Sequence, residues 1–312
     1  MKISPLSIAN IKVDNNVFLA PMAGYTDFAF RKMAIPCGYG LTFTELVSAK
    51  GLMYQNPGNN LLLKADGDYD KTAVQIFGGE EYYLRSACES DYLKPFKIVD
   101  INMGCPVPKV YKNGEGSALL GDIKRAERII KECVKSGKII TVKIRIGLKK
   151  GDDFATDFAK MAEDAGASLI TIHGRVREDY YSGEPNYQAI YNAKKSVKIP
   201  VVANGGIFTK DDADKMIQET GADGIMIARG GIANPFLVSE LMGIKKPCTL
   251  KEFMLGHVSL MAKTYADRRA ALEFRKFVPY YFKGMNGLKD IKLKIYSAES
   301  TDKIIEILQE NL

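Results

Sequence analysis

Eight short apolar segments recur along the first three quarters of the chain, and this repeat constrains the fold more than any other feature. They begin at Val17, Leu41, Thr72, Ile98, Ile139, Ser168, Pro200 and Asp223, at spacings of 23 to 41 residues. A parallel strand with its crossover helix needs about 30 residues, and buried parallel strands are near-continuous apolar runs. The repeat therefore predicts eight strands alternating with helices, which is the count of a TIM (β/α)8 barrel.

The segments between the apolar runs support this reading. Residues 123–137 and 152–166 have apolar residues at helical spacing, and each segment ends in glycine. An open, doubly wound sheet is the alternative arrangement of the same units. Eight units in about 230 residues fit a closed barrel better.

Beyond Asn234-Pro235 the alternation stops, and the remaining sequence predicts helices only. One apolar stripe at helical spacing consists of Leu250, Phe253, Met254, His257 and Met261. We take His257 as a core histidine because of its place in this stripe. We therefore expect a barrel domain over residues 1–240 and a small helical domain over residues 241–312.

The net charge of +7 is concentrated in the helical segment. Residues 245–296 hold 12 lysines and arginines against 4 acidic residues. Such a basic segment attached to a nearly neutral body indicates a polyanionic partner. A solvated surface without a partner is the alternative, and charge alone leaves both open.

Cysteine and histidine usage argues against metal sites and disulfides. The five cysteines are all at least 17 positions apart, so no CxxC motif exists, and the chain has only two histidines. No apolar run approaches the roughly 20 residues of a membrane span, and the first 16 residues contain no signal-peptide core. We expect a cytoplasmic, monomeric protein without a metal.

Polar residues occur at or near the end of every predicted strand. These include Glu45, Gln75, Asn102, Lys143, His173, Asn204 and Arg229. Active sites of barrels lie at the carboxyl ends of the strands, and a structural core has no need of buried polar groups there. The pattern predicts a functional site at that end of the barrel.

The last two strands end in glycine-rich turns, Asn204-Gly205-Gly206 and Ala228-Arg229-Gly230-Gly231. Barrels often bind phosphate in the loops after strands 7 and 8, where glycine lets the backbone approach the anion. Ordinary tight turns are the alternative. Because the chain has no P-loop motif and no complete GxGxxG after a strand, we expect a phosphorylated cofactor held by the barrel itself.

Several longer motifs resemble one enzyme family. The segments are APMAGYTDFAFR (20–31), DINMGCPVPKVYKNGEGSALL (100–120), IHGRVREDYYSGEPNY (172–187) and RKFVPYYFKGMNG (275–287). Together they resemble bacterial tRNA-dihydrouridine synthases over almost the whole chain. The resemblance implies an FMN enzyme that reduces selected uridines of tRNA and is re-reduced by NADPH.

The resemblance also implies a role for individual residues. Cys105 is the family's general acid and protonates C5 of uracil, while reduced FMN passes a hydride from N5 to C6. The residues implied to bind the cofactor are Pro21, Met22 and Ala23 against the flavin, Gln75 and Lys143 at its ring or ribityl chain, His173 nearby, and Asn204, Gly205, Gly206, Ala228 and Arg229 at the phosphate. The residues implied to contact the RNA substrate are Asn102, Lys109, Arg175 and Arg177.

The sequence departs from the family pattern at three places. Ala228 stands where glycine is common, Gly206 where aspartate is common, and Phe277 where the tail motif RKHxxWY has histidine. The first two concern backbone groups, so we expect FMN binding to persist. At the third place the family's histidine, which we expect to contact RNA, is absent, and Pro279 alters the helix beside it.

Two other functions stay open at this point. One is a dihydroorotate-dehydrogenase-like flavin barrel that acts on a free pyrimidine. The other is an RNA-binding protein without catalysis. The basic segment 245–296 argues against the first, and the combination of Gln75, Cys105 and Lys143 argues against the second. Glu45 is equally compatible with a structural and a site role, and Tyr25, Tyr180 and Tyr181 with base stacking and with packing.

Overall fold

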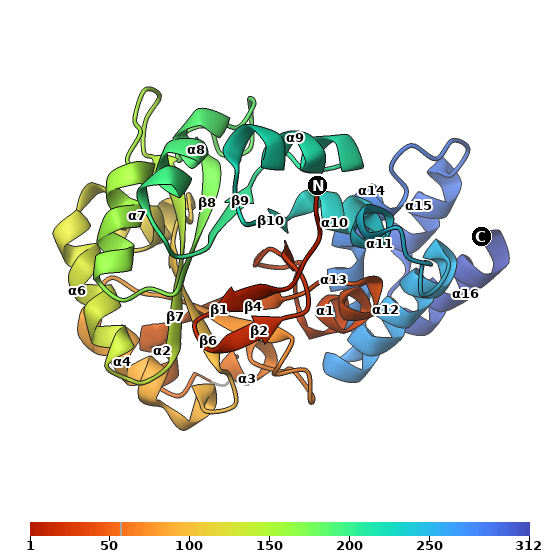
Figure 1. Ribbon diagram of the computed structural model, residues 1–312. Coiled ribbons are helices and arrows are strands. Elements are labelled where there is room, and N and C mark those ends of the chain that lie inside the picture. Colours follow the sequence, from red (N-terminus) through yellow and green to blue (C-terminus); the bar gives the residue numbers. More distant parts are fainter. Residues whose placement is uncertain (57) are drawn as a thin grey trace.

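Eight parallel strands surround a closed core in the computed structural model, which describes residues 1–56 and 58–312 (Figure 1). The strands are β3 (Val17–Leu19), β4 (Thr42–Ser48), β5 (Thr72–Phe77), β6 (Ile98–Met103), β7 (Ile139–Gly147), β8 (Leu169–Val176), β9 (Val201–Asn204) and β10 (Gly224–Ile227). From β4 to β10 each strand pairs with the next in the chain, and β10 pairs with β3. A parallel bridge between Phe18 and Leu41 joins the two remaining edges. All eight predicted strands and the barrel are thereby confirmed.

Helices cover the outside of the barrel. They are α1 (Phe28–Ala34), α2 (Ala49–Met53), α3 (Asn59–Leu62), α4 (Glu81–Glu89), α5 (Pro108–Lys112), α6 (Ile123–Val134), α7 (Ala155–Asp164), α8 (Tyr187–Ser196) and α9 (Lys210–Thr220). The two helices predicted from sequence are α6 and α7. The side chain of Asp122 caps α6 by accepting from the Arg125 amide, and the helix buries one stripe that includes Ile129 and Ile130.

An antiparallel hairpin that the strand count did not include lies at the amino-terminal end of the barrel. It consists of β1 (Leu6–Ile8) and β2 (Ile11–Val13). Ile8 and Val13 are buried against Phe18, Phe43 and other side chains that fill this end of the barrel. The hairpin thus covers the end opposite to the predicted site.

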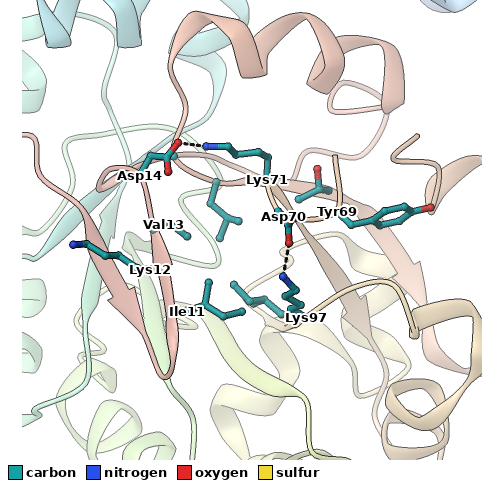
Figure 2. Close-up of a pocket in the computed structure, with 12 residues that line it drawn as sticks. Ile11, Lys12, Val13, Asp14, Tyr69, Asp70, Lys71 and Lys97 are labelled. Carbon is teal, nitrogen blue, oxygen red and sulfur yellow. Dashed lines mark hydrogen bonds and ion pairs between the residues drawn. The ribbon is translucent and has the colours of Figure 1, made fainter. Parts of the chain in front are cut away.

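A shallow cavity of about 280 Å³ opens beside this hairpin (Figure 2). Ion pairs at its rim join Lys71 to Asp14 and Lys97 to Asp70, the second at 2.5 Å. The side chains involved are largely exposed, and exposed pairs of this kind contribute only about 0–1 kcal/mol each. Because this cavity lies where β5 and β6 begin, we assign it no part in catalysis.

Helices alone follow β10, as predicted. They are α10 (Arg229–Ala233), α11 (Leu237–Met242), α12 (Leu250–Thr264), α13 (Asp267–Phe274), α14 (Val278–Tyr281), α15 (Lys289–Ser297) and α16 (Thr301–Asn311). Thr249 and Glu252 form a capping box at the start of α12. The boundary expected between residues 240 and 241 falls within α11, and the division into two domains stays a prediction.

An aromatic cluster joins the helical segment to the barrel. The ring of Phe30 on α1 stacks on Phe277 with centroids 5.6 Å apart and meets Phe253 edge-on. His257 lies in the middle of this cluster, fully buried, and its Nδ1 is 2.8 Å from the Tyr281 hydroxyl. The expectation that His257 is a core residue is confirmed. The helical segment therefore has a fixed position beside the barrel mouth.

Within the described residues, no helix combines the length and apolarity that crossing a bilayer requires. The same part of the chain contains no cluster of three or more histidine, cysteine or acidic side chains arranged to hold a metal ion.

Candidate active site at the carboxyl end of the barrel

A cavity of about 440 Å³ lies at the carboxyl ends of the strands. It brings together most of the residues that the sequence singled out. The predicted site residues that line it are Pro21, Met22, Ala23, Asn102, Cys105, Lys143, His173, Arg175, Asn204, Gly205, Gly206, Ala228 and Arg229. Three further predicted residues, Gln75, Lys109 and Arg177, lie outside its lining.

The cavity is strongly cationic. Lys143, Arg145, Arg175 and Arg229 line it, no lining residue carries a carboxylate, and none of these four cations forms an ion pair within the described chain. Burial and the nearby Arg145 guanidinium lower the pKa of Lys143 to about 8. Uncompensated buried cations are costly, so this cavity is suited to an anionic ligand.

The glycine turn after β9 forms one wall of the cavity. Gly205 and Gly206 have φ angles of +126° and +71°, a region that favours glycine. A Cβ at Gly205 would lie 2.9 Å from a ring carbon of His173. Asn204 is fixed between the Met226 carbonyl, to which it donates at 2.7 Å, and the Lys143 ammonium at 3.1 Å. The backbone of this turn is therefore open to a ligand and closed to larger side chains.

Arg175 lies against the same turn. Its guanidinium donates to the Ser182 carbonyl at 3.0 Å and to the Gly183 carbonyl at 2.7 Å, and it is 3.2 Å from Nε2 of His173. Burial, followed by the charges of the surrounding arginines and Lys143, lowers the pKa of His173 well below its usual value. His173 is consequently neutral at pH 7. The structure thus places Arg175 beside the Gly205-Gly206 turn, whereas the sequence assigned it to RNA, and that contact stays a prediction.

The loop that carries Cys105 is held from three directions. The Cys105 amide donates to Oδ1 of Asn102 at 2.9 Å, and its carbonyl accepts from the Ser117 hydroxyl at 2.7 Å. Arg145 donates to the Gly104 carbonyl at 3.0 Å. Burial raises the pKa of the Cys105 thiol above its ordinary value. A protonated thiol therefore faces the cavity at neutral pH.

Gln75 lies beneath the cavity and does not line it. Its side chain is fully buried and is hydrogen-bonded between Asp100 and Asn102. Through Asn102 these hydrogen bonds reach the cavity, and contact of Gln75 with a cofactor stays a prediction.

Lys109 and Arg177 lie outside the cavity on the side of the Cys105 loop. Lys109 is exposed on α5, and the Arg177 guanidinium lies 3.8 Å from the ring centroid of Tyr111 on the same helix. Contact of these residues with RNA stays a prediction.

Sequence analysis missed two of the four tyrosine and phenylalanine side chains that line the cavity, Phe208 and Tyr280. Tyr181 and Phe208 flank Arg229, with ring centroids 4.6 and 5.7 Å from its guanidinium. Tyr25 meets Tyr280 of α14 edge-on, with centroids 5.6 Å apart. Tyr25 and Tyr181 lie in motifs that were visible in the sequence. The approach of Tyr280 from the helical segment had no local sequence signal.

Two open questions from the sequence receive an answer. One carboxylate oxygen of Glu45 accepts from the Gly24 amide at 2.5 Å, and Glu45 is not among the lining residues, so its role is to hold the turn after β3. Phe277 is 1% exposed within the aromatic cluster. Its side chain points into the core, so Phe277 does not supply the RNA contact that the sequence already expects to be lost at this position. Pro279 is exposed at the start of α14.

The fold is a (β/α)8 barrel with a cationic cavity at the carboxyl ends of its strands. Solved structures with the same fold include histamine dehydrogenase from Rhizobium (TM-score 0.60, 15% identity, 82% of this chain and 50% of that chain). The old yellow enzyme from Trypanosoma cruzi gives a TM-score of 0.56 at 10% identity, over 78% of this chain and 93% of that chain. These identities establish the fold alone.

Sequence comparison gives the family. The family model described as dihydrouridine synthase (Dus) matches residues 18–311. A probable tRNA-dihydrouridine synthase of Rickettsia bellii is 33% identical over 90% of this chain and 89% of its own. tRNA-dihydrouridine synthase B of Pseudomonas aeruginosa is 32% identical over 96% and 93%. The chain belongs to the dihydrouridine synthase family, which consists of flavin-dependent oxidoreductases that act on tRNA.

Proposed function

We propose that this protein reduces the C5=C6 bond of specific uridines in tRNA, with FMN as its cofactor, NADPH as reductant and Cys105 as proton donor. The observation that carries the proposal is that the Cys105 thiol and the Gly205-Gly206 turn line one cationic cavity without a carboxylate. That combination offers a phosphate site and a general acid in a single pocket. The catalytic domain over residues 1–240 supplies both.

The residues present fit the phosphate of FMN. The Gly205, Gly206 and Ala228 backbones border the cavity, and Arg175 and Arg229 lie beside them without an acidic partner. A phosphate dianion there would supply the missing counter-charge. Bound FMN would supply the hydride that the uracil ring receives at C6.

Other lining residues are suited to orient the flavin ring. Pro21, Met22 and Ala23 form an apolar edge of the cavity. Lys143, with a pKa of about 8, is mostly protonated at neutral pH and provides a cation for the negative charge of a reduced flavin. His173 is neutral and contributes hydrogen bonds without charge.

Cys105 supplies the proton. Its S–H bond breaks as a C5–H bond of the uracil forms, and the pair of electrons stays on sulfur as a thiolate. The positive charges of Arg145 and Lys143 favour the thiolate form of Cys105. A thiol in this position is therefore protonated before the step and stabilised after it, which is what a general acid requires.

Most of the RNA would be bound outside the cavity. A uridine inside folded tRNA has to be extruded before it can enter such a pocket, where Asn102 would contact the ring. Lys109, Arg177 and the basic helical segment 245–296 would contact phosphates, which give affinity and orientation without reading bases. The cytoplasm is where this monomer would meet its tRNA.

Two measurements on the purified protein test the proposal. The first is the absorption spectrum, with release and identification of the flavin. FMN is the expected result, and a protein that neither carries nor binds FMN would contradict the proposal. The second follows the reoxidation of chemically reduced flavin, without oxygen, by tRNA from cells lacking this gene.

Free orotate and uridine are the controls for substrate class. We expect reoxidation by tRNA and none by the free pyrimidines. Reoxidation by orotate in place of tRNA would support the dihydroorotate-dehydrogenase-like alternative, and reoxidation by neither would support an RNA-binding protein without catalysis. Parallel reduction of the flavin by NADPH and NADH identifies the reductant.

A further inference from the structure

A buried carboxylate beneath the cavity has no part in the chemistry described so far. Asp100 on β6 has no exposed surface, and it accepts hydrogen bonds of 2.6 Å from the Gln75 amide and from the Thr141 hydroxyl. Both partners lie directly opposite it in register, on β5 and β7. It forms no ion pair within the described chain. Such burial is costly, and a packed barrel core would not need it.

A continuous chain of hydrogen bonds leads from Asp100 to the proposed general acid. The Cys105 amide donates to Oδ1 of Asn102 at 2.9 Å, Nδ2 of Asn102 donates to Oε1 of Gln75 at 2.9 Å, and Nε2 of Gln75 donates to Asp100 at 2.6 Å. Every member of this chain except Cys105 is buried.

Both ends of the chain permit only one direction. A backbone N–H can only donate, and an ionised carboxylate can only accept. The side-chain amides between them must therefore both turn their oxygen toward the Cys105 side and their nitrogen toward Asp100. The charge on Asp100 fixes which atoms Gln75 and Asn102 present.

We propose that Asp100 is a positioning residue for the proton-transfer step, acting through Gln75 and Asn102 on the loop that carries Cys105. This inference rests on the proposed function for the step concerned. The other part of the inference, that oriented side-chain amides hold the Cys105 loop, rests only on the hydrogen bonds given above.

Ionisation of Asp100 gives the idea a measurable signature. Burial raises the pKa of Asp100 to about 6, although the bonds from Gln75 and Thr141 and the charge of Lys143 oppose the shift. Lys143 on β7 is the charged group that acts on it. When Asp100 takes up a proton, the carboxyl becomes neutral. The Thr141 hydroxyl can accept from the new O–H, while the other carboxyl oxygen still accepts from Gln75 but more weakly than a carboxylate does. This end of the hydrogen-bond chain is therefore weakened as the pH falls through about 6.

The kinetic test compares the isosteric Asp100→Asn variant with the parent in anaerobic reoxidation of reduced flavin by tRNA. We expect the parent rate to fall below pH 6. At pH 7.5 the variant should be about tenfold slower, because a neutral acceptor makes roughly half as strong a bond. The variant should also lack the acid inflection, since no carboxyl remains to titrate. Flavin binding and reduction should be unchanged.

A second variant tests the same chain of hydrogen bonds without altering Asp100. Thr141→Val removes one hydrogen bond that favours the charged carboxylate. It should therefore move the acid inflection to higher pH. This variant keeps the proposal falsifiable if the Asp100→Asn protein does not fold.

The structural readout requires no cofactor. In flavin-free protein, the rate at which iodoacetamide alkylates Cys105, measured by mass spectrometry relative to Cys248, reports how firmly the loop is held. We expect alkylation of Cys105 to rise several-fold in the Asp100→Asn variant. Thr171→Val is a matched control, because it removes a buried, unpartnered hydroxyl from the neighbouring strand.

Glu45→Gln is the control for the pH profile, because burial also raises the pKa of Glu45. The acid inflection should persist in that variant. An Asp100→Asn protein with the parental pH profile and the parental Cys105 alkylation rate would overturn the proposal and leave Asp100 a structural residue. Failure of tRNA to oxidise the parent's flavin would instead refute the proposed function, and the alkylation result would still decide whether Asp100 holds the loop.

Discussion

Replacing Cys105 with alanine tests the proposed proton transfer most directly. The thiol lines the cavity, and burial raises its pKa above the ordinary value. Because its pKa lies above the ordinary value for a thiol, Cys105 is predominantly protonated at pH 7. The proton to be donated is therefore already in place, and Cys105→Ala removes it without disturbing the charges of Lys143 or Arg145.

The expected magnitude follows from the role. General acids contribute about 10²- to 10⁴-fold, which corresponds to roughly 3–5 kcal/mol in the barrier at 1.36 kcal/mol per decade. Binding of FMN, its reduction by NADPH and binding of tRNA make no use of the thiol, so those three steps should keep their parental values. Reoxidation of the reduced flavin by tRNA should alone slow by this factor.

The assay is stopped-flow absorbance at the flavin band without oxygen, with each half-reaction measured separately. Cys248→Ala is the matched control, because Cys248 is a partly buried cysteine that does not line the cavity, and all steps should survive it. Parental reoxidation by tRNA in Cys105→Ala would refute the assignment and leave a tyrosine, a lysine or water as the acid. Equal slowing of both half-reactions would indicate a disturbed cavity instead.

Three further predictions concern the cofactor site, the basic segment and the junction between helices and barrel. Gly205→Ala should weaken FMN binding at least tenfold and riboflavin binding much less, because φ is +126° and a Cβ meets a histidine ring at 2.9 Å; fluorescence titration with both flavins measures this. A double variant, Lys289→Glu with Lys294→Glu, reverses two exposed charges of α15 and should weaken tRNA binding. The slope of log affinity against log salt should become shallower by about 0.7–0.9 per lost phosphate contact. An unchanged slope would make this surface a solvated face without a partner. Burial raises the pKa of Asp27, but hydrogen bonds and the charge of His257 outweigh it and lower that pKa. The ionised Asp27 therefore stabilises the folded protein above the ordinary carboxyl pKa of about 3.9, and this stabilisation is lost as the pH falls through the lower pKa of the folded state. Asp27→Asn should therefore lower Tm at pH 7 and flatten the dependence of Tm on pH below about pH 4, as read by calorimetry.

Strand positions and the main chemical groups were accessible from the sequence, because both depend on local patterns. The apolar runs gave all eight barrel strands, and the end of each run placed residues such as Cys105, Lys143 and Asn204 on one rim. Parallel strands all end on the same side of a barrel, so proximity in space followed from position in the repeat. The hairpin β1–β2 was not predicted, because two strands of three residues are too short to show a periodic pattern.

Assignments of individual contacts depended on geometry that the sequence does not contain. Arg175 turned out to lie at the glycine turn because Ser182 and Gly183 draw its guanidinium there. Phe277 lies in the core because its ring stacks on Phe30 of α1, so this position is part of the aromatic cluster. In each case a long side chain or a short helix had several possible directions, and only packing selected one.

By itself, the sequence determined the barrel, the rim on which the site lies and the cysteine that faces it, since these follow from period and order along the chain. Tertiary structure alone decided how Gln75, Asp100 and Thr141 meet. They are separated by 25 and 41 residues in the sequence, and they touch because the register of β5, β6 and β7 sets them side by side. A shift of one residue in that register would turn each of them to the other face of the sheet. The amide chain to Cys105 is a property of strand pairing, which forms only when the whole barrel closes.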